Sequence, residues 1–317
     1  MVKHPVRFGI YTSIRPLEWE PIRNLWQKAD QWGYDSMWHC DHFYQAFPPD
    51  PDGPCLEGWT TITALSQLTK RARIGVMVSG VAYRNPCVLA KMAATLDIIS
   101  GGRLNLGIGA GWYEQEYRNF GFDFKTPGGR LQQLDEACQI IKSMFTQDRT
   151  TLHGRHFNVT DAACVPKPLQ KPNPPILVAG MGEKVLLKTV ARHADMWNGG
   201  GSAEQMKHAV EIIARHADAV GRDGGAIEKT VIMPLCYGVS AETEAAVASG
   251  IAGMFQTSPE EARKQIMIGT RAQCLDTIER YVNAGITHFI FLMTPSNVDT
   301  EFERFAQEVI PQFKGAH

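Results

Sequence analysis

Residues 99–117 read ISGGRLNLGIGAGWYEQEY and hold five glycines, three of which (Gly107, Gly109 and Gly111) alternate behind a short apolar run. The preceding segment, 85–102, has the apolar spacing of a helix, with Pro86 near its start and glycine at its end. The run 103–109, RLNLGIG, predicts a buried strand. A helix that ends in glycine and leads into a buried strand is the repeating unit of an α/β fold.

The same alternation runs along the whole chain of 317 residues. Strands are predicted at 6–12, 34–43, 71–81, 103–109, 174–180, 194–198, 230–239 and 287–293. Helices are predicted at 17–33, 58–70, 85–102, 130–145, 183–192, 204–220, 241–268, 272–284 and 299–313, with a Pro-rich loop at 47–55 and a hairpin-like insertion at 150–159. About eight β/α units without a break in composition favour one domain over 1–317, a closed (β/α)8 TIM barrel with insertions; a doubly wound open sheet is the alternative.

The composition is that of an ordinary globular protein, with 44% hydrophobic and 21% charged residues and a net charge of −1. Lys and Arg are scattered, so we expect no nucleic-acid binding. No apolar run approaches the roughly 18 residues that a membrane span needs, and we expect no signal peptide. The seven cysteines form no CxxC pair, which favours reduced thiols and a cytoplasmic location.

The glycine stretch does not fit a dinucleotide-binding fingerprint. That fingerprint needs G-x-G-x-x-G after the first strand and an acidic residue about 20 positions further on. Here the spacing is G-x-G-x-G, it follows the fourth strand, and the residue 20 positions beyond Gly111 is Leu131. Two interpretations remain: the glycines let the chain leave a barrel rim at positive φ, or they keep the strand end bare so that a flat ring can lie across it.

Polar side chains end the second predicted strand in the sequence HCDHF, residues 39–43. A strand places His39 and Asp41 on one face and His42 on the other, so we expect no metal site. A solvated strand end is one interpretation. An acid and an imidazole at a catalytic rim fit better as hydrogen-bond partners of a cofactor or as proton-transfer groups.

Two further strand ends carry residues with possible chemistry. Ser79 is not a hydrolase nucleophile, because the position two residues before it is Met77 rather than glycine; we expect Ser79 to form hydrogen bonds at the rim. The turn Gly180-Met181-Gly182 between a strand and a helix suits a phosphate group, because glycines give access to unpaired N–H groups. An ordinary βα turn is the alternative.

Taken together, these segments resemble the luciferase-like monooxygenase superfamily, and within it the coenzyme F420-dependent oxidoreductases. The matching stretches are GYDSMWHCDHF (33–43), YRNPCVLAKMAATLDIISGGRLNLGIGAGWYEQEYRNFG (83–121), PPILVAGMGEK (174–184) and GTRAQCLDTIERYVNAGITHFI (269–290). They cover nearly the whole chain. The middle stretch is specific for the superfamily and less specific for the flavin that is used.

The resemblance implies a barrel that holds a flavin-type ring across its carboxyl-terminal rim. It implies that Asp41 and His42 contact the ring, and that a non-proline cis peptide between Met77 and Val78, beside Ser79, backs it. It places Gly107, Gly109, Gly111 and Trp112 in the pocket wall, so that the glycines would clear a shelf for the ring. Finally, it assigns the cofactor's phosphate to the turn formed by Ala179, Gly180, Met181 and Gly182.

One position departs from the family pattern. In the family's glucose-6-phosphate dehydrogenases a glutamate proton donor follows the Gly-x-Gly turn, whereas this chain has Trp112 there. Glu114 and Glu116 follow closely, but a place at a helix end or in a salt bridge explains them at least as well, so the proton donor stays unassigned. Trp112 and Tyr113 instead indicate an aromatic substrate pocket.

The expected function is hydride transfer between C5 of coenzyme F420 and a small organic substrate, with His42 as the proton-transfer residue and Asp41 in support. One alternative is an FMN-dependent monooxygenase. Another, of a different class, is a non-catalytic flavin-binding protein or scaffold. The resemblance also implies a homodimer.

Overall fold

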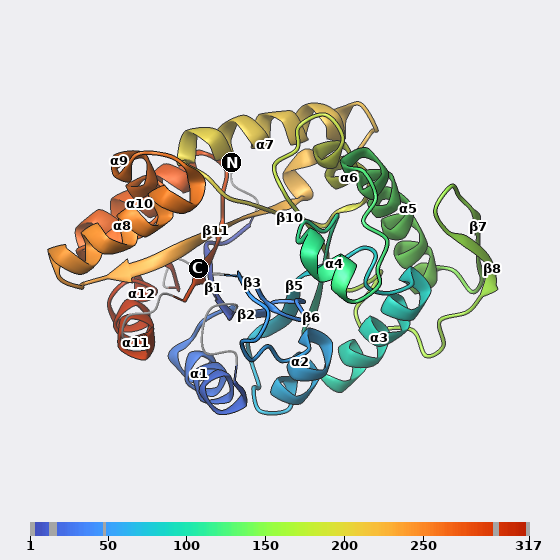
Figure 1. The fold of residues 1–317 in the computed structure, drawn as a ribbon, viewed down its shortest axis with the longest axis horizontal. Coiled ribbons are helices and arrows are strands. Elements are labelled where there is room, and N and C mark those ends of the chain that lie inside the picture. Colours follow the sequence, from blue (N-terminus) through green and yellow to red (C-terminus); the bar gives the residue numbers. More distant parts are fainter. Residues whose placement is uncertain (1–3, 13–17, 47–48, 294–297, 315–317) are drawn as a thin grey trace.

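The computed structural model describes residues 4–12, 18–46, 49–293 and 298–314 (Figure 1). Its main strands are β1 (Arg7–Thr12), β2 (Ser36–His39), β5 (Arg73–Gly80), β6 (Leu104–Gly109), β9 (Ile176–Ala179), β10 (Met196–Gly199), β11 (Glu228–Tyr237) and β13 (His288–Leu292). Together with β12 (Met267–Gly269) they form a sheet in the order β10-β9-β6-β5-β2-β1-β13-β11-β12, and a pairing of β10 with β11 closes it. The strand β12 pairs with the carboxyl end of β11 and is an addition to the ring. Because β10 pairs with β11, the eight main strands form the predicted closed parallel barrel and not an open sheet.

Helices surround the strands (Figure 1). They are α1 (Trp19–Trp32), α2 (Gly58–Ser66), α3 (Pro86–Ile99), α5 (Pro127–Thr146), α6 (Leu186–His193), α7 (Ala203–Asp218), α8 (Ala241–Phe255), α9 (Pro259–Arg263), α10 (Arg271–Asn283), α11 (Val298–Glu308) and α12 (Pro311–Lys314), with a short 3-10 turn at Gly224–Ala226. Their apolar faces pack on the barrel; in α1, for example, Ile22, Leu25, Trp26 and Ala29 are buried. Within the described ranges no helix combines the length and apolarity required to cross a membrane.

The amino-terminal end of the barrel is closed by a buried polar network. Glu228 accepts hydrogen bonds from Arg7 Nη1 at 3.2 Å and pairs with His288 Nδ1 at 3.1 Å, and His288 Nε2 lies 2.7 Å from Ser36 Oγ. Burial opposes ionisation of Glu228, yet His288 and Arg7 lower its pKa to about 2. Because it lies at the face opposite the strands' carboxyl ends, we assign this network to stability.

Several elements differ from the sequence-based expectation. The segment 241–268, expected to be helical, contains α8 and α9 and leads into β12. The expected helix 299–313 is two helices, because Pro311 lacks an N–H group and starts the second one. The helix expected from Glu183 begins at Leu186. The expected helix start at Leu17 lies outside the described residues.

Besides β12, three short elements were not predicted. Helix α4 (Glu114–Asn119) follows β6 and lies inside the ring of outer helices (Figure 1). Strands β3 (Gln45–Ala46) and β4 (Pro49–Asp50) pair in a small hairpin separate from the barrel. The insertion at 150–159 is confirmed as a hairpin, β7 (Thr150–His153) and β8 (Asn158–Ala162), which projects beside α5 (Figure 1).

Candidate active site

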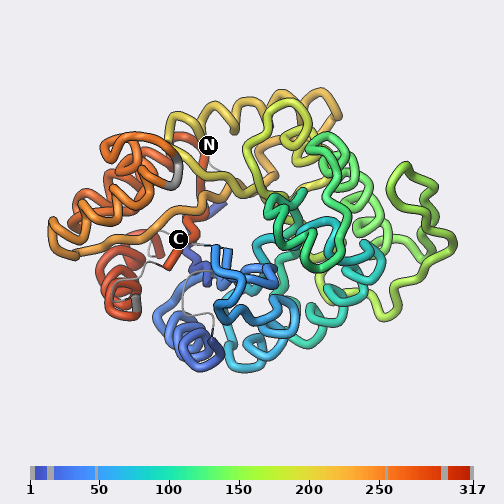
Figure 2. Tube along the Cα trace, viewed as in Figure 1, coloured from blue at the N-terminus to red at the C-terminus, as the bar shows by residue number. Residues whose placement is uncertain are grey.

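The carboxyl ends of all barrel strands open on one face, so the segments that follow β2, β5 and β6 meet there. Figure 2 shows the segment after β2, near residue 45, beside the segment around residue 115, although they are far apart in the sequence. The rings of Phe43 and Phe120 lie 4.7 Å apart between their centroids, which confirms the contact. The mouth of the barrel is therefore lined by these segments.

His42 is paired with a carboxylate at this mouth. Its Nδ1 lies 2.9 Å from Oε2 of Glu116, which is completely buried, while the His42 side chain is 15% exposed. Glu116 also accepts hydrogen bonds from the Tyr83 hydroxyl and from the backbone N–H groups of Phe43 and Tyr44. Burial disfavours the charged form of Glu116, but the donors, led by His42, lower its pKa. Glu116 is thus an ionised carboxylate that holds the imidazole.

Two aromatic side chains, Trp112 and Tyr113, pack against the imidazole of His42. The rings of Trp112 and Tyr113 stack 5.3 Å apart, and both meet the His42 ring edge-on, at centroid distances of 5.6 and 6.1 Å. Trp112 is 51% exposed, whereas Tyr113 is buried. A half-exposed indole beside an imidazole gives this side of the mouth an aromatic surface that suits flat or apolar groups.

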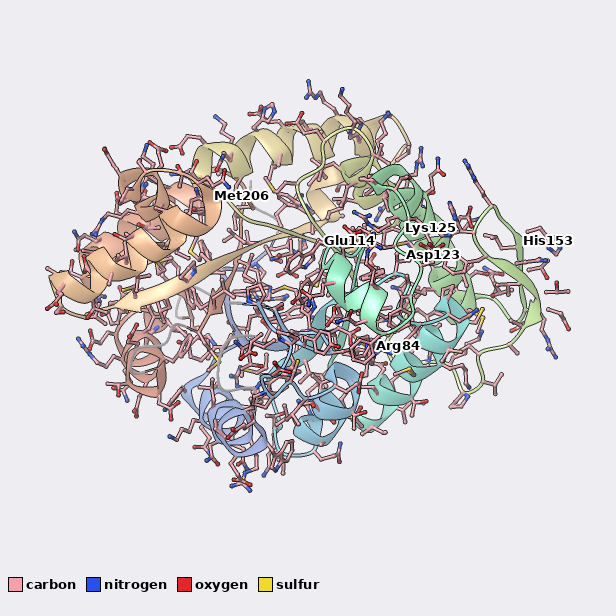
Figure 3. The ribbon with its side chains drawn as sticks, viewed as in Figure 1. Arg84, Glu114, Asp123, Lys125, His153 and Met206 are labelled. Carbon is pink, nitrogen blue, oxygen red and sulfur yellow. The ribbon has the colours of Figure 1, made fainter. Side chains whose placement is uncertain are left out.

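Asp41, the residue before His42, is not part of this aromatic cluster. Its side chain is fully buried, and both oxygens accept hydrogen bonds from Arg84, at 2.6 and 3.0 Å. Arg84, which lies near α4 in Figure 3, also pairs with Glu57. Glu57 in turn caps α2 by accepting from the N–H groups of Trp59 and Thr60. Burial raises the pKa of Asp41, and Arg84 opposes that rise. The carboxylate that contacts His42 is Glu116, so the expected support from Asp41 reaches the imidazole only through the backbone.

Two other polar side chains of these strands are buried. His39 has its Nδ1 3.0 Å from Thr12 Oγ1, and burial lowers its pKa to about 4, so its ring is neutral at pH 7. Ser79 is also fully buried and accepts a hydrogen bond of 2.8 Å from Trp59 Nε1. Ser79 lies near the end of β5 and forms hydrogen bonds there with Trp59 and Asp41, as expected. A contact of Ser79 with a cofactor stays a prediction.

The peptide bond between Met77 and Val78 is cis, as expected, and the β5–β6 register shifts between Val76 and Ser79. The side chain of Val78 lies over Gly107 and Gly109: a Cβ at Gly109 would meet Val78 Cγ2 at 2.7 Å. A Cβ at Gly107 would meet the Val76 carbonyl oxygen at 2.1 Å.

At Gly111 the chain has a φ of 77°, and a Cβ would meet the Tyr117 hydroxyl at 1.7 Å. The three glycines therefore make room for Val78, for the backbone of β5 and for Tyr117. The glycines therefore do not leave bare backbone, because the half-buried Val78 side chain lies against Gly107 and Gly109. That a flat ring lies across this part of the mouth stays a prediction. Positive φ, the other interpretation, holds for Gly111.

Replacing Gly107 with alanine is expected to lower the free energy of unfolding by about 1–3 kcal/mol, because the new methyl group would press on a backbone carbonyl that cannot rotate away. Gly250→Ala in α8 is the control, since a Cβ there would meet nothing within 4 Å and alanine favours a helix. Thermal unfolding followed by circular dichroism compares the two. A Gly107→Ala protein as stable as Gly250→Ala would contradict the packing argument.

The turn after β9 has an open backbone. Ala179, Gly180 and Met181 are half-buried and Gly182 is exposed. Gly180 adopts a φ of 132° and is fixed by hydrogen bonds to Asn198 and Trp197, of 2.9 and 2.8 Å. Within the described chain, the N–H groups of Met181, Gly182 and Glu183 donate to no other backbone group. Because α6 begins only at Leu186, these groups belong to the turn and not to the helix end.

Sequence reasoning missed Arg84, Tyr83 and Glu57, and it left Glu116 without its role. It also missed the glycines 199–201, which adjoin the turn after β9: a Cβ at Gly199 would meet Met181 Sδ at 2.8 Å. A run of three glycines directly after a predicted strand was the available signal. Among the described residues, no three His, Cys, Asp or Glu side chains gather in a set that could hold a metal ion.

Comparison with known proteins identifies relatives of this barrel. The family model for the luciferase-like monooxygenases matches residues 6–257. An F420-dependent glucose-6-phosphate dehydrogenase from Kineococcus radiotolerans is 26% identical over an alignment of 332 positions that covers 97% of each chain.

Two solved structures share the fold along almost the entire chain. An F420-dependent secondary alcohol dehydrogenase, solved with an F420-acetone adduct, superimposes with a TM-score of 0.83 over 97% of this chain and 99% of that chain, at 20% identity. A monooxygenase from Streptomyces bottropensis superimposes with a TM-score of 0.77 over the same shares, at 21% identity. Since the family model spans well over half of the sequence and the fold agrees, the chain belongs to the luciferase-like monooxygenase family.

Proposed function

We propose that the protein is an oxidoreductase that uses coenzyme F420 and transfers a hydride between C5 of the deazaflavin and a small organic substrate. The observation that carries the proposal is a proton-transfer group at the mouth of the barrel, His42 backed by Glu116, beside a half-exposed aromatic wall. The curated relative that matches 97% of the chain is an F420-dependent dehydrogenase, which supports this choice of cofactor.

The residues at the mouth fit such a cofactor. Val78 presents a half-buried apolar surface at the end of β5, suited to a flat ring. In the part of the chain that the structure describes, Met181 and Gly182 of the turn 179–182 have N–H groups that no backbone acceptor uses, which suits a phosphate. These are the residues that would hold the cofactor, together with Trp112 at the side of the mouth.

When bound, the cofactor supplies the hydride chemistry. The chain itself supplies the rest. His42 holds or accepts a proton at Nε2, the ring nitrogen without a hydrogen bond to any described residue. Trp112 and Tyr113 exclude water from that nitrogen and orient an apolar substrate group. Asp41, enclosed by Arg84, keeps the segment 41–43 in place; a direct contact of Asp41 with the cofactor stays a prediction.

FMN-dependent oxygenation is the second candidate, favoured by the family's name and by the fold shared with a monooxygenase. Titrating the purified protein with F420 and with FMN, under exclusion of oxygen, separates the two. We expect tight binding of F420 and weak binding of FMN. Tight FMN uptake with oxygen consumption after reduction would contradict the proposal. F420 binding without turnover over a broad substrate panel would instead favour a non-catalytic protein.

We also propose that the protein forms a homodimer through an apolar surface at α3. Val88, Val165 and Leu169 are 52%, 71% and 54% exposed. Val165 lies beside α3, because Lys91, one helical turn after Val88, donates a 2.5 Å hydrogen bond to the Val165 carbonyl oxygen. A cytoplasmic location also remains a prediction, consistent with seven free cysteines.

Sedimentation equilibrium is expected to show a dimer for the wild-type protein and a shift to monomer for the double variant Val88→Glu, Val165→Glu, because two buried charges would oppose association. Val220→Glu, an exposed valine after α7, is the control and should stay dimeric. A monomeric wild-type protein, or a dimer unaffected by the double substitution, would contradict this surface.

A further inference from the structure

We propose that Glu116 is the positioning residue for His42: with Tyr83 it fixes the imidazole in the tautomer that carries its proton on Nδ1, and it balances the charge when Nε2 becomes protonated. The acid–base step of the reaction then runs through one histidine backed by a buried carboxylate. This inference rests on the proposed function, and it names the residue that makes His42 competent.

The donors around Glu116 determine the tautomer. Oε1 accepts from the N–H groups of Phe43 and Tyr44, the latter at 3.1 Å. Oε2 accepts from the Tyr83 hydroxyl and lies 2.9 Å from His42 Nδ1. An ionised carboxylate only accepts hydrogen bonds, so Nδ1 must be the donor. In the neutral ring the lone pair is then on Nε2, and in the charged ring Nε2 carries the second proton.

Glu116 cannot itself exchange a proton with a substrate. Its side chain is completely inaccessible, and four donors occupy its two oxygens. By contrast, the neighbouring Glu114 on the same helix is half exposed and pairs with Arg118 at the surface. Position 112, directly after the glycine turn, is a tryptophan with nothing to donate but its indole N–H. The imidazole is therefore the proton-transfer group that this wall of the mouth offers.

The charges around His42 support the same assignment. The groups that face it are Glu116 from α4, Tyr113 from the segment before α4, and Cys55, whose Sγ lies 3.2 Å from the His42 carbonyl oxygen. Burial raises the pKa of Tyr113, and burial with the Glu116 contact raises that of Tyr83, so both hydroxyls stay neutral at pH 7. Within the described residues, Glu116 is the ionised partner in contact with the ring.

The first test measures the tautomer of His42 in the absence of cofactor and substrate. In ¹⁵N NMR spectra of the free protein, with the His42 signals assigned through His42→Gln, we expect the neutral ring to carry its proton on Nδ1. Glu116→Gln should mix the two tautomers of His42, because an amide can donate as well as accept a hydrogen bond. A wild-type ring protonated on Nε2 would overturn the proposal, even if the variants failed to fold.

The second test measures kcat of variants at Glu116 and its neighbours. For Glu116→Gln we expect kcat to fall by about 10²-fold, with the dissociation constant of F420 changed by less than about threefold. Tyr83→Phe should give a smaller loss of the same kind, and Glu116→Asp should restore part of the rate. Glu114→Gln is the matched control on the same helix and should leave kcat unchanged. Wild-type kcat and an unchanged His42 tautomer in Glu116→Gln would overturn the proposal.

The two tests also separate this inference from the proposed function. If the protein fails to bind F420 while His42 shows the Nδ1–H tautomer and responds to Glu116→Gln, the function is wrong and the positioning stands. If F420 turnover is found but Glu116→Gln changes neither readout, the function stands and the positioning role is refuted.

Discussion

Replacing His42 with alanine is expected to lower kcat for F420-dependent turnover by about 10²–10⁴-fold while F420 binding is retained. The physical reason is that the mouth loses the nitrogen that moves the proton, whereas Val78 and the turn 179–182, which we expect to hold the cofactor, are untouched. Turnover is measured with a substrate, found in a panel of small organic compounds, that supports the wild-type enzyme.

The control for this substitution is His153→Ala. His153 lies on the β7–β8 hairpin, at the side of the molecule away from the barrel mouth (Figure 3), so its removal should leave kcat unchanged. Fluorescence titration of both variants with F420 distinguishes a lost proton from a lost cofactor. Full turnover in His42→Ala with normal binding would remove His42 from the mechanism.

Replacing Arg84 with methionine is expected to lower the free energy of unfolding at pH 7 by about 3–5 kcal/mol, because it leaves the fully buried Asp41 without its counter-charge. Burial already raises the pKa of Asp41 in the folded wild-type protein, and loss of Arg84 raises it further above its value in the unfolded chain. The penalty is therefore present at neutral pH and shrinks as the pH falls through that raised pKa. Denaturant unfolding at several pH values measures both effects.

Two variants control the Arg84 experiment. Arg280→Met breaks an exposed pair with Asp276 on α10 and should change stability little. The double variant Arg84→Met, Asp41→Asn should recover part of the loss, because the buried charge is removed with its partner. An Arg84→Met protein as stable as Arg280→Met would show that the Asp41–Arg84 pair does not hold the segment after β2.

The barrel could be predicted from the sequence because its signals are local. Each apolar run such as 103–109 is framed by its own helix and glycine, and all eight predicted segments overlap a barrel strand. Boundaries were less certain where a turn intervenes, as at Leu186, or where a proline divides a helix, as at Pro311. The short strand β12 was missed because three residues carry no period.

Only part of the candidate site could be predicted, because only some of its residues have a local signal in the sequence. His42 lies directly after a strand and could be found by its position. Its partner Glu116 is 74 residues away, and nothing local distinguishes it from the surface residue Glu114. The glycines at 107 and 109 were recognised as unusual, but only the three-dimensional structure shows that they accommodate Val78.

The central claim is that a deazaflavin ring binds over the mouth of this barrel, next to His42. A crystal structure of the F420 complex tests it most directly. The account predicts the ring against Val78 with His42 Nε2 facing its reactive carbon, and the phosphate at the turn 179–182. A ring bound elsewhere, or a mouth closed by side chains against the cofactor, would contradict it.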